Sequence, residues 1–232
     1  MDIICSKIED MADYGKESNA RVFSAIIKIV DIESRAKNMV SIISNETWLD
    51  KLNVVERISY EARAKQTIEK LVNIIVNRTA NQLSEEFGEF LVSESAQTYL
   101  EESLSHVKVP LAELFKEKLS GNPGFDFHTQ TESELIAFGE AKYSGSGNPH
   151  GLALGQIGDF IDNEKDKFEL VDLKNFVSDK AIKNFTKGEK AYVAAFSVNG
   201  IIPINILNNA LKSEKLDKLL SYSEVFIIGV QV

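Results

Sequence analysis

The 232-residue sequence contains a single cysteine, Cys5, and it is short of positive charge, with 26 Lys and Arg against 35 Asp and Glu. One cysteine excludes a disulfide within the chain, and nothing in the cysteine usage indicates an oxidising compartment. No apolar run approaches membrane-spanning length, and the first residues are acidic where a secretory signal is basic. We therefore expect a soluble, cytoplasmic protein that does not associate with membranes.

Several common motifs of catalysis and binding are also missing. The three histidines, His106, His128 and His150, are far apart and form no Cys/His ligand pattern, which argues against a zinc site. The sequence has no G-x-S-x-G elbow of a serine hydrolase. The Gly- and Ser-rich tract 144–151 lacks the Gly-Lys-Ser/Thr ending of a nucleotide-binding loop, so we expect no small-molecule cofactor. This tract is either a plain connector or a flap over a substrate.

The distribution of apolar residues predicts the fold class. A hydrophobic content of 44% is enough for one substantial core, or one core with a helical extension. In the second half of the chain, short apolar runs alternate with helical patterns, and we expect strands at 125–128, 135–143, 191–198 and 225–230 with helices at 152–163 and 204–220. Nearly continuous apolar strands separated by helices indicate an α/β fold whose sheet is covered on both faces.

The first part of the chain has a different pattern. Within residues 1–80, apolar residues recur at helical spacing, for example in 22–30 and again in 68–76. We expect an N-terminal helical region at 1–80 and a second domain at 81–232. The lone tryptophan, Trp48, is expected to be a packing anchor, because it lacks a set of basic neighbours. The helical region is interpreted either as a layer over the sheet or as a docking surface for another protein.

Polar residues occur at unusual positions between residues 121 and 143. Asp126 lies in an alternating Phe-Asp-Phe-His segment that predicts a half-buried strand, whereas Glu140 and Lys142 lie two residues apart at the end of a buried strand and so share a face. Charged residues next to such an apolar run need a partner or a metal. Two carboxylates supply the oxygen ligands that Mg²⁺ or Mn²⁺ prefers, and a lysine can activate water or screen the charge of a phosphate transition state. The set predicts phosphodiester hydrolysis.

These residues carry a family resemblance. An Asp followed, after a hairpin-length gap, by Glu-Ala-Lys resembles the signature of the PD-(D/E)xK nuclease superfamily, although no Pro stands beside Asp126. Over about residues 80–232, the order of four short segments is similar to that of the nuclease subunit of the Hachiman anti-phage defence system; the segments are 88–89 (Gly-Glu), 109–111 (Val-Pro-Leu), 124–128 (Gly-Phe-Asp-Phe-His) and 138–142 (Phe-Gly-Glu-Ala-Lys).

The resemblance implies a restriction-endonuclease-like core, with a mixed sheet flanked by helices, that cleaves DNA with Mg²⁺ or Mn²⁺. It implies that Asp126, Glu140, the carbonyl of Ala141 and Glu89 from a helix hold the metal, with Lys142 as the water-activating residue. It further implies a helicase partner and a role in defence against phage.

The identity of the helix glutamate is a separate question. On a helical wheel, Glu86 lies nearer the centre of the apolar stripe than Glu89 does, so helical geometry favours Glu86. The Gly-Glu pair of the resembling family favours Glu89. We expect Glu89, because a ligand at the edge of a sheet should project beside the core stripe and because Gly88 lets a neighbouring strand approach closely.

Four further residues are expected near the substrate. His128 shares a strand face with Asp126, Gln156 lies early in a helix, and Lys183 and Lys187 belong to the only markedly basic stretch of the sequence. Each also has an ordinary explanation: a hydrogen-bonded histidine, a solvent-facing glutamine and a solvated lysine-rich surface.

The charge balance bears on the partner. A net charge of −9 and an isoelectric point near 5.0 repel free DNA at long range. We therefore expect a partner to deliver the DNA. Two alternatives stay open: a restriction or repair endonuclease of the same superfamily that binds DNA without help, and a non-catalytic interaction subunit that keeps the nuclease fold.

Overall fold

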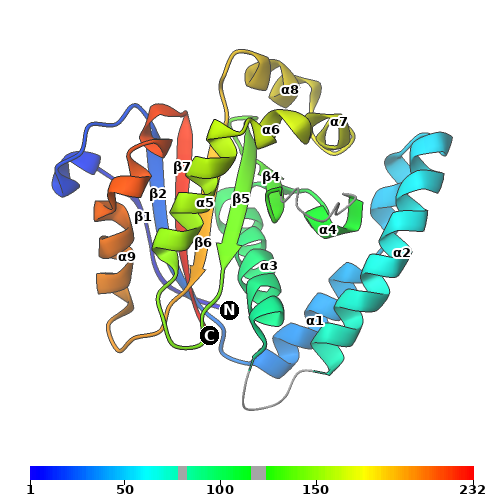
Figure 1. Ribbon diagram of the computed structural model, residues 1–232, viewed down its shortest axis with the longest axis horizontal. Helices are drawn as coiled ribbons and strands as arrows, with labels where there is room; N and C mark the ends of the chain where they lie inside the picture. The colour runs from blue at the N-terminus through cyan, green and yellow to red at the C-terminus, as the bar shows by residue number, and fades with distance from the viewer. Residues whose placement is uncertain (78–82, 116–123) are drawn as a thin grey trace.

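The computed structural model describes residues 1–77, 83–115 and 124–232. Within these residues, seven strands form one mixed sheet in the order β1-β2-β7-β6-β5-β4-β3 (Figure 1). The strands are β1 Asp2–Glu9, β2 Arg21–Lys28, β3 Val107–Lys108, β4 Phe127–Gln130, β5 Ile136–Lys142, β6 Ala191–Ser197 and β7 Glu224–Gln231. The central strands β2, β7, β6 and β5 run parallel, whereas β1, β4 and β3 are joined by antiparallel pairing.

Helices connect and cover these strands. They are α1 Ile32–Ile43, α2 Val54–Val76, α3 Glu85–Leu104, α4 Ala112–Phe115, α5 His150–Asp162, α6 Lys165–Phe168, α7 Leu170–Leu173, α8 Asp179–Thr186 and α9 Pro203–Lys212, with 3-10 turns at Met11–Tyr14, Thr47–Lys51, Glu214–Leu216 and Leu219–Ser221. Apolar residues of α5 and α9 pack on one face of the sheet, and those of α1, α3 and the end of α2 pack on the other. The α/β class expected from the sequence is confirmed.

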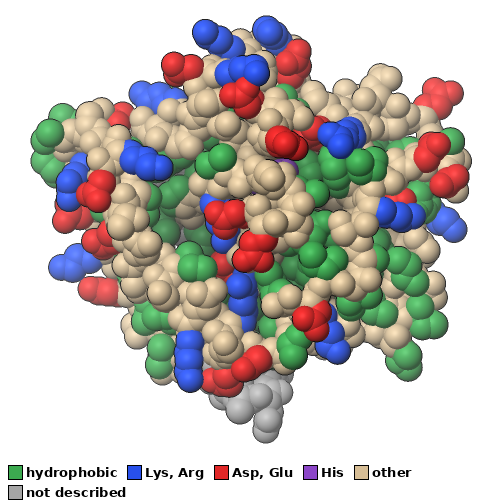
Figure 2. All heavy atoms as spheres, turned by 180° about the vertical axis from the view of Figure 1, so that it is seen from behind, with side chains coloured by type: hydrophobic (Ala, Val, Ile, Leu, Met, Phe, Trp, Pro, Cys, Tyr) green, Lys and Arg blue, Asp and Glu red, His purple; other side chains and the backbone are tan. Residues whose placement is uncertain are grey.

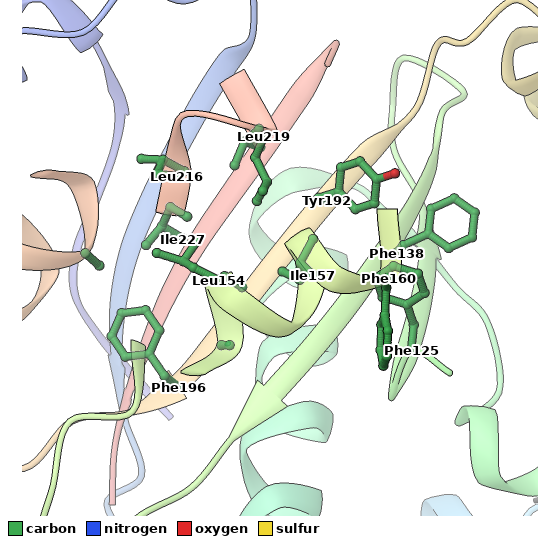
Figure 3. Packing of buried hydrophobic residues seen from close by; sticks show 14 of the residues in the cluster. Phe125, Phe138, Leu154, Ile157, Phe160, Tyr192, Phe196, Leu216, Leu219 and Ile227 are labelled. Carbon is green, nitrogen blue, oxygen red and sulfur yellow. The ribbon is translucent and has the colours of Figure 1, made fainter. Parts of the chain in front are cut away.

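The core between α5 and the sheet contains a cluster of aromatic rings (Figure 3). Phe125 packs against Phe138 of β5 and Phe160 of α5, with ring centroids 5.2 and 5.0 Å apart. Burying an aromatic side chain generally removes about 150–250 Å² of its surface from water. The cluster fixes the segment before β4 against the middle of the sheet, and this segment carries Asp126.

The expectation that residues 1–80 are helical from end to end is wrong for residues 2–28. This segment forms β1 and β2, and β2 pairs in parallel with β7 along its whole length, from Arg21 opposite Glu224 to Lys28 opposite Gln231. A short apolar run fits the periodicity of a helix or of a strand. Pairing with β7, about 200 residues later in the chain, makes this segment a strand. The expected domain boundary at 80/81 lies outside the described residues.

Other elements agree with the sequence. Strands β5, β6 and β7 and helices α5 and α9 begin within two residues of the expected starts, and β4 begins at Phe127, two residues later than expected. Trp48 packs on Tyr60 and Phe176, with ring centroids 6.3 and 5.8 Å apart, as expected of a packing anchor. The sequence Gly-Asn-Pro-Gly at 121–124 is also typical of a turn, but residues 121–123 lie outside the described residues. In the part of the chain that is described, no helix combines the length and apolar character needed to cross a bilayer.

The pH dependence of stability should reveal one buried histidine. His106 is buried between Thr129, whose Oγ1 lies 2.8 Å from its Nδ1, and the ring of Phe226. Burial lowers the pKa of His106 to about 4 from 6.5, so the unfolded chain binds the proton first as the pH falls. The stability from this neutral histidine is therefore complete above pH 6.5 and is lost on the way to pH 4, by about 3 kcal/mol.

Urea titrations between pH 7 and pH 4 check this prediction. The free energy of unfolding of the wild-type chain should fall more steeply than that of His106→Gln, which has no titrating ring. Parallel pH profiles for the two proteins would show that His106 titrates equally in the folded and unfolded chains.

Candidate active site

Asp126 is held at the start of β4 by the neighbouring strand. Its backbone N–H donates to the carbonyl of Gly139 at 2.9 Å, and its carboxylate Oδ2 accepts the N–H of Ala141 at 2.9 Å. Both contacts are to β5, because β4 and β5 pair in an antiparallel hairpin with Phe127 opposite Gly139. The hairpin thus brings Asp126 to the end of β5 that carries Glu140 and Lys142, as the sequence predicted.

Glu140 and Lys142 form a tight pair at that end of β5. The Lys142 Nζ donates to Glu140 Oε1 at 2.6 Å and to the carbonyl oxygen of Ala141 at 3.2 Å. Glu140 is fully buried, with 0% of its surface exposed. A carboxylate in such a position has lost its hydration, and the lysine compensates only part of that loss.

The helix α3 contributes a third carboxylate. Glu89 Oε1 lies 3.5 Å from Lys142 Nζ, whereas Glu86 Oε1 lies 2.8 Å from Lys70 Nζ on α2. The Glu86 side chain thus extends to the surface between the two helices, and Glu89 lies beside the pair on β5. Of the two glutamates considered from the sequence, Glu89 is the one that contacts Lys142.

Gly88 permits this close approach of α3 to the end of β5. A Cβ on Gly88 would lie 2.2 Å from ring atoms of Tyr143, the residue after Lys142. No Cβ can occupy that space unless the ring or the helix moves. The absence of a side chain at Gly88 therefore sets the distance between Glu89 and Lys142.

Replacing Gly88 with Ala should destabilise the chain and separate α3 from β5. The clash should cost about 1–3 kcal/mol, more than the roughly 0.5–1 kcal/mol that Ala gains over Gly in a helix. Gly158→Ala in α5 is the matched control, because its Cβ would meet nothing closer than Lys218 Cδ at 3.8 Å. Urea titrations should show loss of stability for Gly88→Ala and none for Gly158→Ala; equal effects would mean that Tyr143 moves aside without cost.

Electrostatics distinguish the members of the site. Burial, followed by the negative charge of Asp126, raises the pKa of Glu140 well above 4.5, and Lys142 offsets only part of this effect. Burial alone would lower the pKa of Lys142, but the charges of Glu140 and Asp126 outweigh it and raise that pKa above 10.5. A buried carboxyl whose pKa is raised by burial and by a second carboxylate is common at catalytic sites.

The oxygen atoms of the site suit a divalent metal. Among the described residues, no group of three or more His, Cys, Asp or Glu side chains forms a ready-made metal centre. However, Glu140 Oε2 is buried without a hydrogen-bond partner in the described part of the chain, and the Lys142 ammonium contacts Glu140, the Ala141 carbonyl and Glu89. The site therefore already binds a cationic group through hard oxygen atoms, which is the ligand type that Mg²⁺ and Mn²⁺ prefer.

His128 does not reach the site. Its side chain is fully buried, and its Nε2 lies 2.6 Å from Glu169 Oε2, while the other oxygen of Glu169 accepts the N–H of Phe125 at 3.0 Å. The expectation of substrate contact by His128 is wrong, because no surface of the ring is exposed, and the alternative of an ordinary hydrogen-bonded histidine is confirmed. Glu169 was missed, since it lies 41 residues from His128 in sequence and no local pattern connects the two.

Lys183 and Lys187 are exposed, but they lie at the end of the sheet opposite to Lys142. Their helix α8 is attached where β5 begins, because Asn184 Nδ2 donates to the carbonyl of Glu134 at 3.0 Å. Lys142 lies at the opposite end of β5, roughly 20 Å away at 3.3 Å per residue. A substrate bound only beside Lys142 does not reach these lysines, and contact of Lys183 and Lys187 with a phosphate of a longer substrate stays a prediction. Gln156 is half-buried on α5, and its proposed contact with substrate stays a prediction.

Comparison with known proteins gives no match: no family model matches the chain, and no curated protein matches it.

Proposed function

We propose that this protein is a metal-dependent nuclease that hydrolyses phosphodiester bonds in DNA, with a restriction-endonuclease-like core. The observation that carries the proposal is the fully buried Glu140, paired with Lys142 and lying beside Asp126 where β4 and β5 meet. A carboxylate kept dehydrated next to a second carboxylate costs stability, and such costs are characteristic of catalytic sites. The mixed α/β sheet is compatible with this core but also occurs in many other folds.

In this proposal the chain's own oxygen atoms hold the metal. The ligands would be the carboxylates of Asp126, Glu140 and Glu89 and the carbonyl of Ala141. A bound Mg²⁺ or Mn²⁺ would supply Lewis-acid chemistry, polarising the phosphate. The N–H of Ala141 orients Asp126, and the hairpin of β4 and β5 keeps the two strand carboxylates together.

Lys142 has two possible roles, and its pKa favours one of them. A lysine can accept a proton from the attacking water or, when charged, stabilise negative charge on the phosphate. Because the neighbouring carboxylates raise the pKa of Lys142, it is charged at neutral pH. Lys142 is therefore assigned to the second role as long as the carboxylates face it.

The charge of the whole chain supports a partner. Figure 2 shows acidic and basic side chains interspersed over one face of the molecule, without a continuous basic area. At a net charge of −9, long-range attraction of DNA is absent. We propose that a helicase partner delivers DNA to a cytoplasmic complex that acts against phage, as the family resemblance implies.

The proposal is tested by incubating the purified chain with supercoiled, linear and single-stranded DNA and with RNA, in Mg²⁺, Mn²⁺ or EDTA. Cleavage of DNA that requires the metal is expected, and Glu140→Gln purified in parallel controls for a contaminating nuclease. Cleavage that is equal for both proteins, or absent in every condition with and without a co-purified partner, would reject the nuclease assignment. Tight DNA binding by the chain alone would favour the stand-alone endonuclease.

A further inference from the structure

Two loops meet beside the candidate active site. The first follows β5, beginning two residues after Lys142, and the second follows β6, which pairs with β5 so that Lys142 lies opposite Phe196. Asn199 of the second loop donates from Nδ2 to the carbonyls of Ser144 and Gly147, at 2.6 and 2.8 Å, and its N–H donates to Asn148 Oδ1 at 2.9 Å. These three bonds join the loops into one unit at the lower end of the sheet in Figure 1.

The joined loops present apolar side chains to water. Ile201 is 100% exposed and Ile202 is 55% exposed, and Pro203 follows them at the start of α9. Leu152 of α5 and Ile204 of α9 are also exposed. Aliphatic side chains scattered singly over a surface need no explanation. Two adjacent isoleucines at the tip of an anchored loop beside the candidate active site do need one.

The position of this tip relates it to the cleavage site. Two residues of extended chain span at most about 7 Å, so the path from Lys142 through Ser144 and Asn199 to Ile201 is on the order of 15–20 Å at most. That length corresponds to no more than about six nucleotides of a stacked strand. A strand that runs from Glu140 and Lys142 toward the joined loops would reach the isoleucines within that length.

We propose that Ile201 and Ile202 form an apolar wedge that inserts into the base stack of a nucleic acid strand beside the cleavage site. The proposal rests on the proposed nuclease function and adds how the substrate is engaged. Isoleucine and proline are among the residues that proteins insert between base steps, and unstacking a step kinks the duplex.

A nucleic acid is favoured over a protein partner for two reasons. The exposed group comprises two isoleucines with two aliphatic neighbours, whereas a stable protein interface involves roughly 20–30 residues on each side. The adjacent pocket of about 420 Å³ is lined by the loop after β5, by the start of α5 and by Lys215, whose amine lies 2.8 Å from the carbonyl of Gly151. An exposed lysine at that position suits a phosphate of the strand that passes the wedge.

The test compares two double variants. The first combines Ile201→Ser and Ile202→Ser, and the control combines Val54→Ser and Val55→Ser. The control changes two equally aliphatic residues of α2, 74% and 77% exposed. Both variants should keep the wild-type melting temperature, because the replaced side chains face water. The probe is a DNA duplex that carries 2-aminopurine at successive positions, mixed with each protein in EDTA so that binding occurs without cleavage and is followed by the anisotropy of a terminal dye.

Unstacking by the wild-type chain should raise 2-aminopurine fluorescence at one or two neighbouring positions, and the isoleucine variant should lose this rise while the valine control keeps it. In Mg²⁺, the ratio of duplex to single-strand cleavage should fall roughly 10-fold in the isoleucine variant alone. Binding without a fluorescence rise, or an unchanged ratio, would overturn the wedge and assign the isoleucines to a protein partner. No binding and no cleavage of any DNA by the wild-type chain, with and without a co-purified partner, would reject the nuclease function and the wedge together.

Discussion

Glu140→Gln is expected to lower metal-dependent cleavage by roughly 10³-fold or more, while the folded chain becomes no less stable. The loss follows because an amide keeps the shape of the side chain but cannot supply the charge that would hold a divalent metal. Burial raises the pKa of Glu140, so ionising this group in the folded chain costs stability as the pH rises above the ordinary pKa of a carboxyl. The amide of Glu140→Gln does not ionise, and this cost is absent in the variant. Single-turnover cleavage and thermal melting at pH 7 measure the two effects.

Lys142→Met is the companion variant that separates metal binding from chemistry. It removes the ammonium that contacts Glu140 and Ala141, so Mn²⁺ binding measured by calorimetry should be retained or strengthened. Cleavage should nevertheless be lost, because the charge that stabilises the phosphate is gone. Wild-type cleavage by either variant would contradict the proposed chemistry, and loss of Mn²⁺ binding in Lys142→Met would show that the lysine supports the fold of the site instead.

The second large effect concerns the helix glutamates. Glu89→Gln should lower metal-dependent cleavage by at least about 10–100-fold, because it removes a proposed metal ligand and even the loss of a group that only supports a ligand has an effect of this size. Glu86→Gln is the matched control on the same helix, since it changes an exposed pair with Lys70 on α2 and should leave cleavage unaltered. Rates for both variants at saturating and limiting Mg²⁺ check the prediction, because loss of a ligand should raise the Mg²⁺ concentration required.

The reverse result would be equally informative. If Glu86→Gln lost activity and Glu89→Gln kept it, the contact of Glu89 with Lys142 would be incidental, and the helical-wheel argument for Glu86 would hold.

The sequence predicted the parts of this protein whose pattern is local. Strands β5, β6 and β7 are nearly continuous apolar runs between helical patterns, and the sequence predicted these three strands together with α5 and α9. Asp126, Glu140 and Lys142 could be placed together because a hairpin brings its two arms side by side and because alternate residues of a strand share a face. These inferences need only spacing along the chain.

The sequence failed where contacts between distant segments decide the structure. The run 22–30 fits a helix or a strand by its apolar pattern, and only pairing with β7 at the other end of the chain makes it β2. Local composition suggested Lys183 and Lys187 as phosphate contacts, but composition carries no information about which end of the sheet α8 would cover. His128 was assigned to the substrate because its partner, Glu169, belongs to a segment 41 residues away.

Diffraction from crystals soaked in Mn²⁺, collected at the manganese absorption edge, tests the central claim most directly. The account predicts an anomalous peak about 2.1 Å from carboxylate oxygens of Asp126 and Glu140 and from the carbonyl of Ala141, with the Lys142 ammonium displaced from Glu140. A peak at a different site, or no peak with Lys142 still bonded to Glu140, would contradict it.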